Sequence, residues 1–164
     1  MIVIVMGVSG VGKTTVGRKL AARLGWEFLD ADDFHTAANI EKIKQALPLE
    51  DEDREPWLKA IHEELARRSA EKSAEKQNTV LACSALKREY REKLQVNSDV
   101  RFIYLKGTYS VIAERLRSRQ GHFAGERVLA SQFSTLQEPE DAIVVDADSP
   151  VDNVIAEICV QMGL

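Results

Sequence analysis

Short apolar runs alternate with longer segments of helical periodicity along most of the chain. Five runs are predicted to form strands: Ile2–Met6, Glu27–Asp30, Thr79–Cys83, Arg101–Leu105 and Ala142–Asp146. Seven periodic segments are predicted to form helices: Lys13–Leu24, Ala38–Leu47, Asp53–Gln77, Ala85–Gln95, Tyr109–Arg119, Glu126–Leu136 and Val151–Met162. Because most of the strands are apolar throughout, we expect them to be buried on both faces. The pattern predicts an α/β fold with a parallel sheet between helices.

Composition and charge narrow the class of protein. The 164 residues carry 22 Lys and Arg against 26 Asp and Glu, a net charge of −4, which gives no reason to expect a nucleic acid partner. No apolar run reaches the roughly 18 residues of a membrane span, and the apolar start at Met1–Met6 lacks the basic region of an export signal. Cys83 and Cys159 indicate two reduced, partly buried thiols. We expect one cytoplasmic domain over residues 1–164, with no membrane partner.

A phosphate-binding motif follows the first predicted strand. Residues 7–14, Gly-Val-Ser-Gly-Val-Gly-Lys-Thr, match G-x-x-x-x-G-K-[ST] between a strand and a helix, as the motif requires. The glycines allow a tight curl that points backbone N–H groups inward, while Lys13 can reach the β- and γ-phosphates and Thr14 can ligate Mg²⁺. The residues expected to bind ATP are Gly7, Val8, Ser9, Gly10, Val11, Gly12, Lys13, Thr14 and Thr15. This loop alone leaves the reaction open.

Three carboxylates follow the second predicted strand, at the sheet edge where the phosphate loop lies. If the strand alternation continues past the strand end, Asp30 and Asp32 share one side and Asp33 opposes them. We assign Asp30 to the Mg²⁺ shell and Asp32 to the acceptor hydroxyl, and we expect His35 to contact the substrate. The alternative is a solvated acidic loop that caps the next helix, chiefly for Asp33.

The third predicted strand leads to Ser84, which is predicted to cap a helix whose first turns hold Lys87 and Arg88. The helix dipole disfavours cations there, by roughly 0.3–1 kcal/mol, so we expect one of them to meet a bound anion. A surface lysine without a ligand is the alternative.

Arg115 and Arg119 stand one helical turn apart, before a predicted helix break at residues 121–123. Arginine can stack on adenine and bind phosphate oxygens, so the pair predicts a basic lid over approximately residues 115–136 that covers ATP. Two solvated arginines are the alternative. We also expect residues 148–150, after the last strand, to border the adenine.

Taken together, these strings resemble the gluconate kinase family, in the branch of P-loop kinases that also holds shikimate kinases and nucleoside monophosphate kinases. The resemblance spans almost the whole chain and rests on Met6–Thr14, Phe28–His35, Asn39–Lys42, Pro48–Leu49, Asp51–Leu58, Cys83–Lys87, Phe102–Gly107, Arg119–Phe123, Ser131–Phe133 and Leu136–Pro139. The phosphate loop marks only the superfamily. The strings Asp-Arg-x-Pro-Trp-Leu, Cys-Ser-Ala-Leu-Lys and Gly-His-Phe mark the family. Thr36, Ala46 and Ala124-Gly125 depart from its usual pattern.

The resemblance implies a three-layer P-loop NTPase fold with a five-stranded sheet and a small helical lid. It implies Mg²⁺- and ATP-dependent phosphorylation of D-gluconate to 6-phospho-D-gluconate, often by a cytoplasmic homodimer, and it places Arg54 at the substrate carboxylate. The expected catalytic residues are Lys13, Asp32 and Arg119; the expected substrate-binding residues are Asp32, His35, Arg54, Lys87, His122 and Gln132; and the expected metal ligands are Thr14 and Asp30. The alternatives are a kinase for another small hydroxy acid or a nucleoside monophosphate, and a non-catalytic nucleotide-sensing protein.

Overall fold

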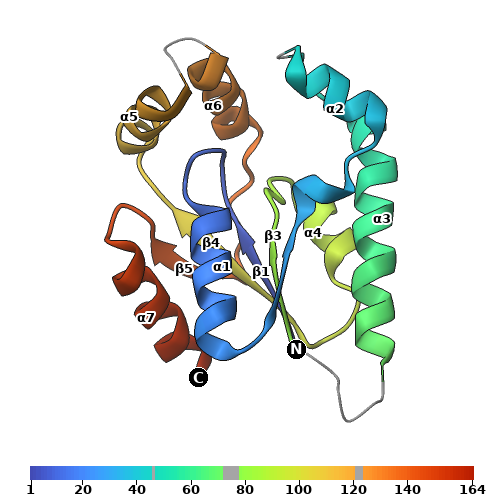
Figure 1. Ribbon diagram of the computed structural model, residues 1–164, viewed down its shortest axis with the longest axis vertical. Coiled ribbons are helices and arrows are strands. Elements are labelled where there is room, and N and C mark those ends of the chain that lie inside the picture. Colours follow the sequence, from blue (N-terminus) through green and yellow to red (C-terminus); the bar gives the residue numbers. More distant parts are fainter. Residues whose placement is uncertain (46, 72–77, 121–123) are drawn as a thin grey trace.

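The fold is built on one parallel sheet, seen in a computed structural model (Figure 1). The structure describes residues 1–45, 47–71, 78–120 and 124–164. Side chains are described for all of these except residues 119–120 and 124–126. The strands are β1 Ile2–Met6, β2 Glu27–Asp30, β3 Thr79–Ala82, β4 Val100–Lys106 and β5 Ile143–Asp146. They lie in the order β2-β3-β1-β4-β5, and every neighbouring pair is parallel. The predicted five-stranded parallel sheet is confirmed.

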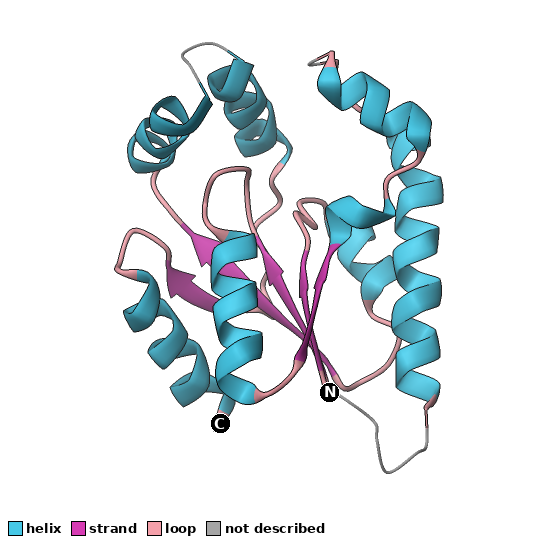
Figure 2. Ribbon diagram, viewed as in Figure 1, coloured by secondary structure: helices cyan, strands magenta, loops and turns pink. Residues whose placement is uncertain are grey.

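Helices cover both faces of the sheet (Figure 2). They are α1 Lys13–Leu24, α2 Ala37–Lys44, α3 Asp51–Ala70, α4 Arg88–Leu94, α5 Tyr109–Gln120, α6 Ala124–Thr135 and α7 Val151–Met162, with a short 3₁₀ helix, η1, at Ala31–Phe34. Helices α1 and α7 lie on one face, and α3 and α4 lie on the other (Figure 1). Helices α2, α5 and α6 rise beyond the carboxyl edge of the sheet, where parallel α/β folds bind their ligands.

Side chains of β1 alternate between the two faces of the sheet and contribute to two separate hydrophobic cores. Val3 and Val5 pack with α1 and α7, while Ile2, Ile4 and Met6 pack with α3 and α4; all five are at most 4% exposed. A strand buried on both faces cannot shift without opening both cores. It is therefore a rigid base for the loop that follows Met6.

The segment before α4 differs from its prediction. The helix begins at Arg88 instead of Ala85, so the proposed cap at Ser84 is wrong. Ala85 has a left-handed φ of 45° and is fully buried, so this stretch packs into the core as a loop. The buried Arg91 side chain satisfies two backbone hydrogen-bond acceptors of the loop, because its Nη1 donates to the carbonyls of Ala85 and Leu86, each at 3.1 Å.

The starts of α2 and α3 also differ from the predictions. Helix α3 begins at Asp51, two residues before its predicted start at Asp53. Asp53 lies in the first turn and accepts from the backbone N–H of Glu50 at 2.9 Å. Thr36, which departs from the family pattern, caps α2 by accepting from the backbone N–H of Asn39 at 3.2 Å. The predicted extension of α3 over residues 72–77, and residue 46, lie outside the described residues.

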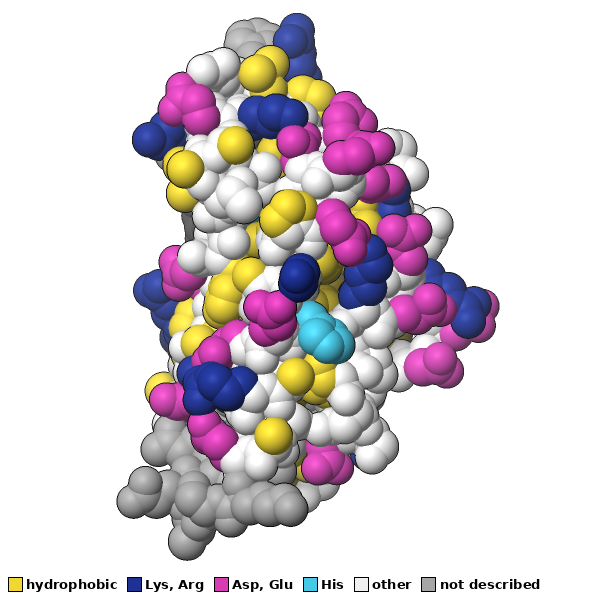
Figure 3. All heavy atoms as spheres, turned by 90° about the vertical axis from the view of Figure 1, so that its right-hand side faces the viewer, with side chains coloured by type: hydrophobic (Ala, Val, Ile, Leu, Met, Phe, Trp, Pro, Cys, Tyr) yellow, Lys and Arg dark blue, Asp and Glu magenta, His cyan; other side chains and the backbone are white. Residues whose placement is uncertain are grey.

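Within the described residues, Cys83 and Cys159 are buried and unbonded, and burial raises the pKa of the Cys83 thiol to about 12. None of the helices described here has the length and apolar character needed to cross a membrane. On the face shown in Figure 3, Lys and Arg side chains are interspersed with Asp and Glu. That face therefore carries charge of both signs.

Candidate active site

The phosphate loop leaves the carboxyl end of β1 and turns into α1. Gly10 and Gly12 adopt left-handed φ angles of 80° and 109°, which side chains rarely tolerate. A Cβ at Gly10 would also lie 2.7 Å from the Leu116 side chain of α5, so this loop and α5 touch without room for a methyl group. Glycine is therefore required at position 10 on two independent grounds.

Lys13 lies in the first turn of α1 and folds back over the loop. Its Nζ donates to the Val8 carbonyl at 2.9 Å, which is the side of the loop where phosphate oxygens are expected. Burial lowers the pKa of Lys13, and the nearby carboxylates of Asp32 and Asp30 oppose that effect. Phosphate oxygens would oppose it further, because they add negative charge around the ammonium group.

Thr14 and Asp30 converge, as their predicted shared role requires. The Thr14 hydroxyl donates to Asp30 Oδ2 at 2.9 Å, and Asp30 Oδ1 accepts from the backbone N–H of Asp32 at 3.1 Å. Mg²⁺ usually keeps several waters and takes only one or two protein oxygens beside phosphate oxygens, so this hydroxyl and carboxylate fit it. No group of three or more His, Cys, Asp or Glu able to hold a metal ion occurs among the described residues.

Asp32 reaches the site in a different way from the predicted one. The strand alternation ends at Asp30, because the chain turns into η1, so the argument that placed Asp30 and Asp32 on one strand face is wrong. The Asp32 carboxylate, 86% exposed, lies 3.8 Å from His35 Nε2. Desolvation and the neighbouring Asp30 carboxylate raise the pKa of Asp32. Water screens so exposed a group, and a substrate covering it would strengthen the effect.

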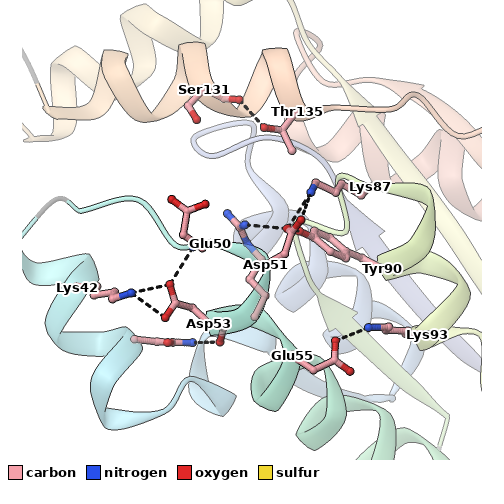
Figure 4. A network of polar contacts seen from close by, with 12 residues as sticks. Lys42, Glu50, Asp51, Asp53, Glu55, Lys87, Tyr90, Lys93, Ser131 and Thr135 are labelled. Atoms are coloured by element: carbon pink, nitrogen blue, oxygen red, sulfur yellow. Dashed lines mark hydrogen bonds and ion pairs between the residues drawn. The ribbon is translucent and has the colours of Figure 1, made fainter.

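A second cluster forms around the carboxylate of Asp51, in the first turn of α3. Lys87 Nζ donates to both of its oxygens at 2.6 and 2.8 Å, and the Tyr90 hydroxyl donates to Oδ1 (Figure 4). Arg54 Nη1 lies 3.5 Å from the same oxygen. The hydrogen bonds from Lys87 and Tyr90 hold the pKa of Asp51 below its usual range. Arg54 and Lys87, both predicted to bind the substrate, therefore contact the same carboxylate, that of Asp51.

In this structure, Lys87 and Arg88 near the start of α4 pair with carboxylates of the protein itself. Lys87 is the N-cap residue of α4, so it lies at the helix end where the dipole disfavours a cation, one residue before the first turn. Its anion in this structure is Asp51, and Arg88 pairs with Glu92 on the surface at 2.9 Å. The contact of Arg54 with Asp51 also accounts for an arginine among the acidic residues 50–55.

Helix α6 reaches the phosphate loop through Gln132. Its Oε1 accepts from the backbone N–H of Ser9 at 2.5 Å, so this residue, predicted to bind substrate, contacts the phosphate loop. Arg119 belongs to α5, but its side chain is not among those described, and His122 lies outside the described residues. Their predicted roles stay predictions.

A pocket of about 320 Å³ lies beside the phosphate loop. It is lined by the loop and α1, by Arg115 from α5, and by residues 147–151, which lead from β5 into α7. Arg115 Nη1 donates to the Ala147 carbonyl at 2.9 Å, which fixes the guanidinium group at the rim. Residues 148–150, which are predicted to border the adenine, line this pocket, and their contact with a nucleotide base stays a prediction.

Four residues near the site were not assigned a role from the sequence: Asp51, Tyr90, Asn39 and Trp57. Asp51 gives no signal of its own because it is one of five acids in residues 50–55. Trp57 is 3% exposed, as a core residue of α3 would be, and it also stacks on His35. The sequence signal that could have singled out Asn39 is its position three residues after Thr36, the N-cap of α2.

A parallel sheet with this loop between its central strand and α1 defines a P-loop nucleotide-binding fold, and comparisons with known proteins identify the family within that class. The shikimate kinase family model matches residues 9–162. The thermoresistant gluconokinase of Escherichia coli K12 is 44% identical over 162 residues, covering 94% of this chain and 89% of its own. The crystal structure of a gluconokinase from Sinorhizobium meliloti superposes with a TM-score of 0.85 at 38% identity, covering 98% and 90% of the two chains. The chain belongs to the gluconokinase family.

A sugar kinase from Janibacter, solved without ligand, is similar in the same way, with a TM-score of 0.86 at 39% identity over 99% of this chain and 94% of that one. The shikimate kinase of Aquifex aeolicus has a TM-score of 0.61 at 17% identity and shows the shared fold alone. The predicted family and fold class are therefore confirmed.

Proposed function

We propose that this protein transfers the γ-phosphoryl group of ATP to the terminal hydroxyl of D-gluconate and forms 6-phospho-D-gluconate. The observation that carries the proposal is the cluster of Arg54, Lys87 and Tyr90, which already holds a carboxylate at the ligand-binding edge of the sheet. A sugar acid presents the same chemical group. The names of the similar gluconokinases support the same substrate.

The residues around the phosphate loop can position both reactants. Lys13 and the loop amides would hold the phosphate chain, and Arg115 and Arg119 would cover the nucleotide from the lid. Thr14 and Asp30 would hold Mg²⁺, which supplies positive charge against the phosphate oxygens when bound. Asp32 would orient the acceptor hydroxyl, and its raised pKa makes it a better proton acceptor than an ordinary aspartate.

The chemical step balances with these groups alone. The hydroxyl oxygen forms a bond to the γ-phosphorus while the bond from that phosphorus to the β–γ bridging oxygen breaks, and ADP leaves. The hydroxyl proton passes to Asp32. Positioning and charge neutralisation, rather than covalent catalysis, then account for most of the acceleration. We propose a cytoplasmic homodimer as the working state, on the family resemblance.

A substrate panel tests the proposal. Purified protein is incubated with ATP and Mg²⁺ and with gluconate, other sugar acids, shikimate or nucleoside monophosphates, and ADP release is measured. The proposal expects the highest kcat/KM with gluconate. A higher value with another hydroxy acid or a nucleoside monophosphate would favour the kinase alternatives, and ATP binding without turnover on any acceptor would favour a nucleotide-sensing protein.

A further inference from the structure

Asn39, in the first turn of α2, has an amide group whose orientation is determined by its surroundings. The residue is 2% exposed, and its Nδ2 donates to the backbone carbonyl of Asp53 at 2.8 Å. A carbonyl oxygen can only accept, so the amide end that faces Asp53 is the NH₂ group. This contact ties α2 to the first turn of α3, and it fixes which end of the amide faces the neighbouring histidine.

The second hydrogen of that NH₂ group faces His35. Asn39 Nδ2 lies 3.4 Å from His35 Nδ1, so Nδ1 must present its lone pair and cannot carry a proton. The proton of the neutral ring then lies on Nε2. Protonating the ring would set two N–H groups against each other, which agrees with a lowered pKa of His35 from desolvation.

The ring of His35 is also held in plane. It stacks on Trp57 with centroids 4.8 Å apart and an interplanar angle of 9°, and its side chain is only 9% exposed. Trp57 is fixed in turn, because its Nε1 donates to the carbonyl of Ala31 at 2.6 Å. His35 therefore has little freedom to flip its ring.

The remaining edge of the ring faces Asp32, with Nε2 lying 3.8 Å from Oδ1. The charged groups that face His35 are Asp32, from η1, and Arg54, from α3. We infer that Asn39 is a positioning residue that holds His35 as the neutral Nε2–H tautomer, with its N–H directed at Asp32. A neutral donor orients the carboxylate and lowers its basicity less than an imidazolium would. This inference rests on the proposed function only in its catalytic consequence.

The tautomer is measurable without any substrate. Two-bond ¹H–¹⁵N spectra of protein labelled at histidine distinguish Nδ1–H from Nε2–H rings, and His35→Gln and His62→Gln assign two of the three histidines. His62 is an internal control, because its Nδ1 lies 2.7 Å from the carbonyl of Lys93 and must be the protonated nitrogen. We expect opposite tautomers for His35 and His62 at neutral pH. A proton on Nδ1 of His35 would overturn the inference, whatever the variants do.

Asn39→Leu removes the donor and keeps the branching and the number of heavy atoms of the side chain. We expect His35 to become a mixture of tautomers with a higher pKa, kcat for gluconate to fall by roughly tenfold with KM for ATP unchanged, and the acid limb of the pH–kcat profile to move to higher pH. Asn39→Asp, which replaces the donor with an acceptor, should move that limb further. Asn153→Leu is the matched control, since Asn153 is exposed at the same position of α7, and should change none of these.

An unchanged His35 tautomer and pH profile in both Asn39 variants would also overturn the inference, even if activity fell, because a merely structural role predicts that outcome. The failure of the proposed function looks different. In that case the wild-type spectra show the expected tautomers, but gluconate is not phosphorylated.

Discussion

Truncating Arg54 to alanine removes one of the two cations around Asp51, and we expect it to lower kcat/KM for gluconate much more than for a neutral polyol such as sorbitol. The Arg54 side chain is 28% exposed and lies 5.9 Å from the Tyr90 ring, so a bound substrate would complete its burial. In the complex, Arg54 and the gluconate carboxylate would form a desolvated charge pair. Truncating one partner of such a pair costs roughly 2–5 kcal/mol of binding free energy. Because Lys87 remains as a second cation, we expect the lower part of that range, about 2–3 kcal/mol, or roughly 30- to 150-fold.

The assay measures kcat/KM for both acceptors in wild type, Arg54→Ala, Arg54→Lys and a control, Arg67→Ala. Arginine matches a carboxylate with two parallel N–H groups and lysine does not, so Arg54→Lys should recover only part of the loss. Arg67 lies on the same helix but is 56% exposed and pairs with Glu64, so its removal should leave both values unchanged. An equal fractional loss on gluconate and sorbitol in Arg54→Ala would refute carboxylate recognition by Arg54.

Four further changes test other parts of the site and the fold. Lys13→Ala should abolish turnover while the thermal unfolding profile stays close to wild type; wild-type turnover would contradict the role of the loop. Asp32→Asn should lower kcat strongly with little change in ATP affinity, and lost ATP binding with kcat intact would contradict that assignment. Gly10→Ala should raise KM for ATP because it adds a clash to the left-handed strain, whereas Gly25→Ala, with φ 66° and open space around it, adds strain alone and should leave KM unchanged. Arginine contacts lower the pKa of Glu64 to about 2, so the ionised Glu64 stabilises the fold above about pH 4.5, and this stabilisation is lost as pH falls toward 2. Glu64→Gln should therefore flatten the fall in unfolding free energy between about pH 4.5 and about pH 2. An unchanged slope would exclude this ion pair as the source of the fall.

Local patterns predicted the sheet and most helices because each signal is self-contained. The run Ile2–Met6 reads as a buried strand, and Lys13–Leu24 ends at Gly25, a left-handed helix end, with bounds that match the structure. The start of α4 could not be read in this way. Ala85 and Leu86 favour a helix locally, but burial in the core and the reach of Arg91 hold them in a loop.

The candidate site was predictable where one motif carries it and not where it is assembled from distant segments. Thr14 and Asp30 could be assigned a joint role, because a motif and a strand end each point to the same sheet edge. The contact of Asp51 with Lys87 spans 36 residues and has no local signal. The effect of Asn39 on His35 depends on which end of an amide faces a ring, and this requires the position of the Asp53 carbonyl.

A ³¹P NMR spectrum of the product formed from ATP and gluconate tests the proposed phosphoryl transfer directly. The proposal predicts ADP and one new phosphate monoester in equal amounts, with the ester phosphorus coupled to two equivalent or nearly equivalent protons. That coupling requires attachment at the terminal CH₂OH carbon. An ester coupled to a single proton would place the phosphate on a secondary hydroxyl, and ADP with free phosphate and no ester would show hydrolysis without transfer. Either result would contradict the proposed reaction.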